Sequence, residues 1–299
     1  MDSEYQTGIA FTNDTYVPVE EAKISLLDWG FLRSDANQDT ISVWNGAFFR
    51  LEDHLDRFER NIRKLRFECP HSRDEQRRIL TECVRRTGFR NAYVQMLMTR
   101  GRPPIGVRDI RACANKFHVF CLPYMWLAPE GARGRGLHMK ISQIQRVPPE
   151  TVDPTIKHYH WLDFEMGLFE AYDAGADTVI LVDRDGNIAE GPGFNIFVVK
   201  DGCLATPATG VLDGITRRTA IELCSQAHIE CVLTPIPPSR VYDADEVFLS
   251  STAGGLIPAT TVDDRRIGDG KPGPITNQLN ASYWSKREAG WYATPIDYR

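Results

Sequence analysis

The chain has 299 residues, of which 42% are hydrophobic and 25% charged, proportions that are ordinary for a globular protein. Its formal net charge of -5 gives no general attraction to nucleic acid or to an anionic membrane surface, so neither partner is expected. The sequence also lacks a run of about 18 apolar residues that could span a membrane. Residues 1–13 lack the basic start and apolar stretch of a signal peptide, and the seven cysteines contain no CxxC pair. A cytoplasmic protein with free thiols and no metal site is therefore expected.

The first part of the chain is predicted to alternate strands and helices. The dipeptide Asn45-Gly46 between two short apolar runs indicates a β-hairpin. Ser72 and Glu75 have the spacing of a capping box, which marks the start of a helix that ends near Gly88. In chain order, we expect strands at 41–44 and 47–50, a helix from about 53 with apolar residues 55, 58, 62 and 65 on one face, the capped helix, and strands at 92–99 and 117–122.

A domain boundary is predicted at residues 127–136, where a proline and three glycines interrupt the pattern. Residues 1–126 would form a small N-terminal domain, and residues 137–299 a larger C-terminal domain. Strands and helices mixed in both halves predict an α+β protein. The elements expected after the boundary are strands at 139–143, 178–182, 195–200 and 246–250, and helices at 161–174, 216–228 and 274–287.

Four short segments carry candidate functional residues, although each has an ordinary structural explanation by itself. Lys157 precedes an amphipathic helix, where a lysine is usually exposed, and Glu190 precedes a turn rich in glycine. Thr216 lies at a predicted helix start, where free N–H groups and the helix dipole favour an anion, although a simple N-cap is the commoner role. Thr252 follows an apolar strand, in a turn or in a second cluster of phosphate donors.

Together, the order and spacing of these segments resemble the fold-type-IV family of pyridoxal-phosphate enzymes, from about Tyr16 to Tyr298. That family holds branched-chain aminotransferases, D-amino acid aminotransferases, aminodeoxychorismate lyases and (R)-selective amine transaminases. The resemblance implies a small N-terminal α/β domain, a larger C-terminal mixed α/β pseudo-barrel domain that binds the cofactor, and a homodimer.

The resemblance also implies roles for individual residues. Lys157 would form the Schiff base with pyridoxal 5'-phosphate and, once released, act as general base and acid. Glu190 would pair with the pyridine nitrogen and keep it protonated, so that the ring can accept electrons. Arg57, which periodicity alone would leave on an exposed helix face, would bind the phosphate. The remaining cofactor contacts would come from Leu212, Ile215, Thr216, Ser251 and Thr252.

Residues expected to face the substrate indicate the branch of the family. Branched-chain enzymes carry Tyr-x-Arg where this chain has Tyr93-Val-Gln95, so their carboxylate-binding arginine is absent here. D-amino acid enzymes carry an arginine and a histidine at positions that match Ile105 and Val107. The stretches that instead resemble (R)-selective amine transaminases are 30–35, 42–44, 49–51, 53–55, 146–149, 153–154, 191–196 and 252–258.

Such an enzyme would move an amino group from a primary amine to a keto acid such as pyruvate, whose carboxylate needs a cation. Arg108 resembles the family's mobile loop arginine, and Arg102 and Arg111 compete with it in the same loop. Members of the family often have a tyrosine where this chain has Gln38, and a glutamate where it has Gln95. The open alternatives are a D-amino acid aminotransferase, a branched-chain aminotransferase, an aminodeoxychorismate lyase and a cofactor-binding protein without turnover. The full set expected at the substrate is Gln38, His54, Tyr93, Gln95, Arg108, Trp161 and Ala253.

Overall fold

The computed structural model describes residues 5–299, so that residues 1–4 of the N-terminal segment considered above lie outside it. The chain divides into two compact units. Unit 1 contains the described residues up to Met125, together with Ile156–Tyr159 and Gly290–Arg299, and unit 2 contains Trp126–Thr155 and His160–Ala289.

This division differs from the expected boundary at 127–136. That segment contains helix α4 (Glu130–Arg135) and belongs to unit 2, because Ala128 and Ala132 are buried in its apolar core. The chain also returns to unit 1 twice, at residues 156–159 and at its C-terminal end. Both returns depend on hydrogen bonds between residues far apart in sequence. The positions of proline and glycine, from which the boundary was predicted, give no information about such contacts.

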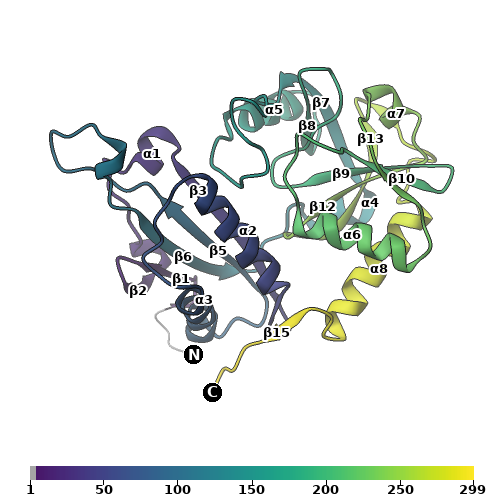
Figure 1. Cartoon of the computed structure of the whole chain (residues 1–299). Helices are drawn as coiled ribbons and strands as arrows, with labels where there is room; N and C mark the ends of the chain where they lie inside the picture. Colours follow the sequence, from purple (N-terminus) through teal and green to yellow (C-terminus); the bar gives the residue numbers. More distant parts are fainter. Residues whose placement is uncertain (1–4) are drawn as a thin grey trace. The chain divides into compact units, whose positions relative to one another are not determined.

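Unit 1 is built on one antiparallel sheet with the strand order β15-β4-β3-β5-β6-β1-β2. Helices α2 and α3 pack against the sheet, α2 on β3 and α3 on β1, β5 and β6 (Figure 1). Its elements are β1 (Ile9–Thr12), β2 (Thr15–Pro18), α1 (Trp29–Arg33), β3 (Ala36–Trp44), β4 (Ala47–Phe49), α2 (Leu51–Lys64), α3 (Arg73–Thr87), β5 (Ala92–Thr99), β6 (Lys116–Pro123) and β15 (Ala293–Pro295).

Local signals in unit 1 are confirmed. Asn45 and Gly46 both have positive φ, 50° and 80°, as a two-residue hairpin turn of the type that matches strand twist requires. Ser72 and Glu75 form the complete capping box of α3, and Gly88 ends that helix in the left-handed region. These signals succeed because each depends on neighbours in sequence.

Unit 2 is built on a mixed sheet with the order β11-β10-β9-β12-β13-β7-β8, to which β14 adds beside β13. Helix α5 packs on β7 and β8, whereas α6 and α8 pack on β12 and β13. Its further elements are β7 (Leu137–Gln145), α5 (Leu162–Asp173), β8 (Thr178–Val182), β9 (Asn195–Lys200), β10 (Cys203–Thr206), α6 (Ile215–Gln226), β11 (Cys231–Leu233), α7 (Pro238–Tyr242), β12 (Glu246–Ser251), β13 (Gly255–Val262), β14 (Arg265–Arg266) and α8 (Pro274–Glu288).

All elements expected after residue 137 are present, and the central strand β13 was not expected. It begins at Gly255 and contains Pro258, two residues that usually argue against a central strand. Pairing with β12 on one side and β7 on the other overrides that local signal.

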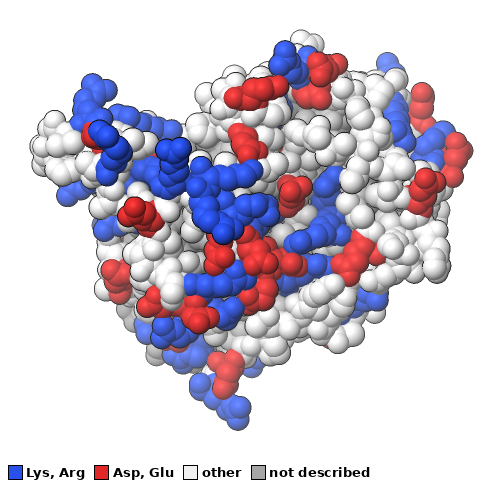
Figure 2. Space-filling model, in the orientation of Figure 1, with Lys and Arg blue, Asp and Glu red and all other residues white. Residues whose placement is uncertain are grey.

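The surface carries charges of both signs. Figure 2 shows acidic and basic side chains interspersed on the face that it displays. Within residues 5–299, no helix is long and apolar enough to cross a membrane.

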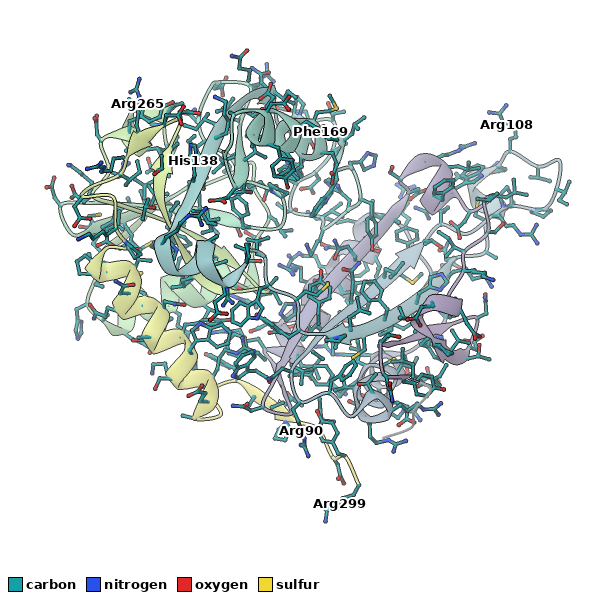
Figure 3. The ribbon with its side chains drawn as sticks, turned by 180° about the vertical axis from the view of Figure 1, so that it is seen from behind. Arg90, Arg108, His138, Phe169, Arg265 and Arg299 are labelled. Atoms are coloured by element: carbon teal, nitrogen blue, oxygen red, sulfur yellow. The ribbon has the colours of Figure 1, made fainter. Side chains whose placement is uncertain are left out.

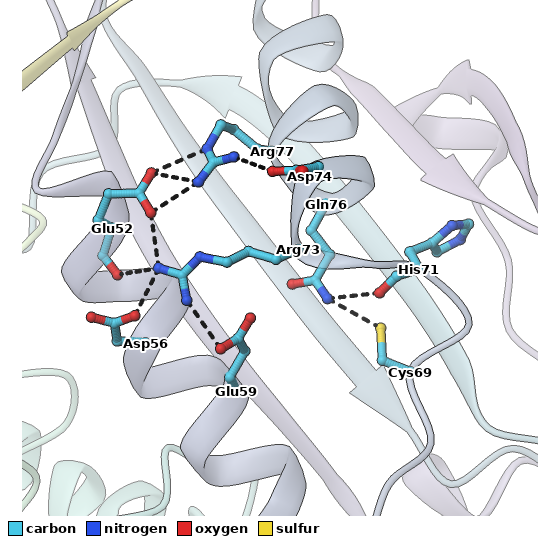
Figure 4. Close-up of polar contacts among 9 residues, drawn as sticks. All are labelled: Glu52, Asp56, Glu59, Cys69, His71, Arg73, Asp74, Gln76 and Arg77. Atoms are coloured by element: carbon cyan, nitrogen blue, oxygen red, sulfur yellow. Dashed lines mark hydrogen bonds and ion pairs between the residues drawn. The ribbon is translucent and has the colours of Figure 1, made fainter.

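An ion-pair network on this surface joins α2 to α3 (Figure 4). Arg73 contacts Glu52, Asp56 and Glu59 at 2.8, 2.7 and 3.0 Å, and Arg77 adds a second contact to Glu52 at 3.0 Å. Each exposed pair contributes little alone, but pairs that share partners act together to hold the two helices. The outer face of α2 is therefore fixed by charge, while its inner face lies on the sheet.

Candidate functional site

The expected functional residues fall into two groups, one in each unit. Unit 1 holds Gln38, His54, Arg57, Tyr93, Gln95, Arg108 and Lys157. Unit 2 holds Trp161, Glu190, Leu212, Ile215, Thr216, Ser251, Thr252 and Ala253.

The backbone of Lys157 is held on two sides within unit 1. Gln38 N of β3 donates to Lys157 O at 2.8 Å, and Asn37 pairs with His158 in an isolated bridge. Asn61 of α2 is fully buried, and the orientation of its amide that satisfies both neighbours accepts from Lys157 N at 3.1 Å and donates to Arg57 O at 3.2 Å. The point from which the lysine side chain starts is therefore fixed by a strand and a helix. Asn61 was not predicted from the sequence, because a polar residue on a helix has no local mark of an inward position.

Arg57 lies inside unit 1, and the sequence alternative that left it on an exposed helix face is wrong, because its guanidinium binds Asp39. Arg57 Nε and Nη2 donate to the two Asp39 oxygens, each at 2.8 Å. His54 Nδ1 lies 2.7 Å from Asp39 Oδ1, and all three residues are buried. His54, expected at the substrate, therefore contacts Asp39 and is only 1% exposed.

The electrostatics of this group follow from its burial. Burial by itself raises the pKa of the Asp39 carboxyl, but the contacts with Arg57 and His54 outweigh it and hold that pKa well below its usual range. Burial lowers the pKa of His54 more than Asp39 raises it, so the imidazole is neutral near neutral pH. Asp39 and Arg57 consequently form a pair of opposite charges. The neutral His54 imidazole adds a hydrogen bond to Asp39 and no further charge.

The opposite face of β3 carries an uncharged hydrogen-bond network. The single Thr40 hydroxyl proton is shared between Gln38 Oε1, at 3.1 Å, and Gln95 Oε1, at 3.2 Å, and Tyr93 OH donates to Gln95 Oε1 at 3.2 Å. Gln95 Nε2 donates to Tyr159 OH at 2.6 Å. Burial raises the pKa of both tyrosines, so they keep their protons at neutral pH. The network brings together three expected residues, Gln38, Tyr93 and Gln95, and adds Thr40 and Tyr159, which were not predicted from the sequence.

The three loop arginines differ in their contacts. Arg111 is bound to both oxygens of Asp109, at 2.6 and 3.0 Å. Arg108 is exposed, follows Gly106 at a φ of 86°, and points away from the sheet of unit 1 (Figure 3). Arg102 is exposed as well. Arg111 is therefore the least available of the three for a new anion.

In unit 2, both oxygens of Glu190 are engaged. Arg146 Nε donates to Oε1 at 3.3 Å, and Leu212 N donates to Oε2 at 2.9 Å. Arg146 also donates from Nη1 to Asp163 at 2.6 Å, and its guanidinium stacks 4.1 Å from the centre of the Phe164 ring. The carboxylate is thus buried, paired with a neighbouring cation and fixed in orientation, which suits it to hold a protonated ring nitrogen. The stretch 146–149 was marked by the resemblance, but the contact between Arg146 and Glu190 was not predicted, because these two residues are 44 positions apart.

The first turn of α6 offers backbone donors suited to a phosphate. Gly214 is the N-cap and supplies no side-chain cap, and Ile215 and Thr216 follow it in buried positions. A Cβ at Gly214 would lie 2.1 Å from Asn195 Oδ1, so only glycine fits this approach. Asn195 Nδ2 also donates to Leu212 O at 3.0 Å, which joins this turn to the residue that holds Glu190.

The turn after β12 is fixed by its own contacts. Ser251 Oγ donates to Gly193 O at 2.9 Å and accepts from Ala253 N at 3.2 Å. Trp161 precedes α5 and packs edge-on against Phe164, with ring centres 5.6 Å apart. Ser251 therefore orients the turn that carries Thr252 and Ala253. In unit 2, the Glu190 carboxylate can accept from the pyridine end of a pyridoxal phosphate, and the backbone N–H groups of the first turn of α6 can donate to its phosphate end. Within the described residues, no group of three or more His, Cys, Asp or Glu side chains could hold a metal ion.

Comparison with known proteins shows the family to which the chain belongs. The profile of the family described as amino-transferase class IV matches residues 38–262. A putative branched-chain-amino-acid aminotransferase of Methanocaldococcus jannaschii is 32% identical, over 91% of this chain and 94% of that protein. A branched-chain-amino-acid aminotransferase of Pseudomonas aeruginosa is 34% identical, over 80% of this chain and 78% of that protein. The crystal structure of the T.th. branched-chain amino acid aminotransferase with pyridoxamine 5'-phosphate superposes with a TM-score of 0.91 at 29% identity, covering 98% of this chain and all of that one.

Proposed function

Since the chain belongs to the amino-transferase class IV family, and is thereby a pyridoxal-phosphate-dependent aminotransferase of fold type IV, we propose that it is an (R)-selective amine transaminase. It would move an amino group from a primary amine to a keto acid such as pyruvate. The observation that carries the proposal is the uncharged network around Gln95, at the position where branched-chain members of the family carry an arginine. A donor without a carboxylate needs no cation there, whereas an amino acid would lose a charge-assisted hydrogen bond.

We propose a cofactor contact for each of the residues that the resemblance implies. Lys157 would bind it covalently, Glu190 would hold its ring nitrogen, and Arg57 would hold its phosphate. When bound, the cofactor supplies a ring that accepts electrons from the substrate carbon. The released amine of Lys157 would then move the proton at that carbon, from a backbone fixed by Asn61. The remaining contacts would come from Leu212, Ile215, Thr216, Ser251 and Thr252.

The substrate side follows the same reasoning. We propose that the amine lies beside the network of Gln38, Tyr93 and Gln95, with Trp161 and Ala253 also in contact. Arg108 would bind the keto acid carboxylate, because it resembles the family's loop arginine, while Arg111 already pairs with Asp109.

A panel of donors tests the substrate class. With pyruvate as acceptor, (R)-1-phenylethylamine should react and its (S) enantiomer should react much more slowly. Faster reaction of the (S) amine would contradict the (R)-selective proposal while leaving the aminotransferase assignment intact. D-alanine is included in the panel, and reaction with it alone would favour a D-amino acid aminotransferase.

Arg108→Ala tests the second half-reaction separately. Loss of a charged hydrogen bond is worth about 1.5–3 kcal/mol, so the KM for pyruvate should rise about 10- to 150-fold. The single-turnover reaction with (R)-1-phenylethylamine, followed in the cofactor spectrum, should be nearly unchanged. Arg111→Ala is the matched control and should change neither, since that side chain is held by Asp109. An unchanged KM in Arg108→Ala would move the role to Arg102.

A second candidate is the branched-chain-amino-acid aminotransferase activity named for the relatives. The identity of 32% and 34% to these two relatives supports this activity. The glutamine at position 95, where branched-chain enzymes carry an arginine, does not support it. L-leucine and L-valine in the donor panel decide between them, because a branched-chain enzyme would prefer both to any amine.

We also propose a cytoplasmic homodimer. Exposed apolar side chains support a self-associating surface in each unit: Phe31 is 60% exposed in unit 1, and Leu162 and Phe169 are 75% and 61% exposed in unit 2. Analytical sedimentation at micromolar concentration measures the oligomeric state, and a monomer at all concentrations would contradict the proposed dimer.

A further inference from the structure

We propose that Asp39 is a positioning residue that orients Arg57 toward the cofactor phosphate, with His54 fixing Asp39 from its other side. The inference rests on the proposed phosphate role of Arg57. It assigns to Asp39 and His54 a function that acts through Arg57.

The geometry of the pair defines the orientation of the guanidinium. Arg57 Nε and Nη2 donate to different oxygens of Asp39, each at 2.8 Å, which is a bidentate contact. A single contact would leave the guanidinium able to rotate, whereas two parallel contacts fix both its plane and the edge that faces Asp39. The two contacts consequently also fix the direction in which the third nitrogen, Nη1, points.

Asp39 is itself immobilised. It lies in the middle of β3, opposite Met96 of the neighbouring strand β5, and its side chain has no exposed surface. His54 lies on α2 one turn before Arg57, and its Nδ1 is 2.7 Å from Asp39 Oδ1. Because burial keeps the imidazole neutral, His54 donates a hydrogen bond to Asp39 without competing as a second cation.

The two possible roles of the Asp39 carboxylate predict opposite effects of its loss on phosphate binding. If Asp39 orients Arg57, its loss leaves a rotating guanidinium and weakens phosphate binding. If Asp39 acts only as a counterion, its loss exposes the phosphate to a stronger positive charge and tightens binding. The three short contacts in a fully buried setting favour orientation, because the ordering of the arginine side chain is completed before the cofactor arrives.

The test compares pyridoxal 5'-phosphate with pyridoxal, which lacks the phosphate, on each apoenzyme. The quantity is the ratio of the pyridoxal Kd to the pyridoxal-phosphate Kd, since effects on the ring and on Lys157 cancel in it. Asp39→Asn should lower this ratio about tenfold or more, and Arg57→Ala should lower it at least as much. In the double variant, Asp39→Asn should add nothing to Arg57→Ala, because a positioning residue has no effect without its target. Asp56→Asn is the matched control, since Asp56 binds Arg73 at 2.7 Å on the exposed side of the same helix.

Each outcome has a distinct meaning. An unchanged or increased ratio in Asp39→Asn, beside a lowered ratio in Arg57→Ala, overturns the positioning role alone. An unchanged ratio in Arg57→Ala overturns the proposed phosphate role and the inference with it.

If Asp39→Asn does not fold, Arg57→Lys keeps the charge pair but cannot make two parallel contacts. This variant should lower the ratio about fivefold or more. A ratio equal to that of the parent enzyme would overturn the positioning role.

Discussion

Arg146→Gln should destabilise unit 2 far more than any substitution of a surface arginine. Arg146 lies between Asp163, at 2.6 Å, and Glu190, at 3.3 Å, and its side chain is 6% exposed while theirs are 7% and 6%. Glutamine leaves two buried carboxylates without that cation. Removal of one partner from a buried ion pair costs about 3–5 kcal/mol. For a domain of this size, each kcal/mol shifts Tm by about 2–4 °C, so the apoenzyme should melt about 6–20 °C lower.

Thermal unfolding of the apoenzyme, followed by circular dichroism at pH 7, measures the effect. Arg184→Gln is the control, because Arg184 pairs with Glu150 at 3.4 Å where both side chains are more than half exposed, and its loss should cost about 1 kcal/mol or less. Saturation with cofactor should narrow the deficit of Arg146→Gln, since a protonated ring nitrogen would give Glu190 a second cation. Equal melting of the two variants would refute the reasoning that Arg146 compensates buried charge.

Three further predictions concern single residues. Lys157→Ala should retain cofactor without the visible absorption of the covalent adduct and should lose transamination; full amine transfer by it would contradict the assignment. Asn61→Ala should speed hydrogen exchange at the Lys157 amide, whereas Asn61→Asp, which keeps an acceptor, should not; equal exchange in both would show that the contact is unimportant. Two α3 arginines hold the pKa of Glu82 at about 2, so its stabilising contribution is complete above its usual pKa and is lost as pH falls toward 2. The difference in urea midpoint between the parent and Glu82→Gln should therefore shrink across that window, and a constant difference would contradict it.

The predictable parts of the structure are those that depend on neighbours in sequence. The capping box at Ser72, the turn at Asn45 and the apolar face of α2 were all identified, because each signal lies within a few residues. The burial of Arg57 could not be predicted in this way, since its partner Asp39 lies 18 positions earlier on a strand. Likewise, the return of Lys157 to unit 1 depends on hydrogen bonds to β3 and α2, which no local pattern records.

Strand β3 combines these long-range contacts, because successive side chains of a strand point to opposite faces. Asp39 faces α2 and binds Arg57, whereas Gln38 and Thr40, on either side of it, belong to the uncharged network on the other face. The backbone of the same strand holds Lys157 through Gln38 N. A substitution of the Gln38 side chain should therefore change the preference among amines while leaving cofactor retention intact, whereas Asp39→Asn should have the reverse effect. Retention of pyridoxal phosphate after dialysis and relative rates with two amines separate the two effects. Loss of cofactor in Gln38→Ala would show that the two faces of β3 are not independent.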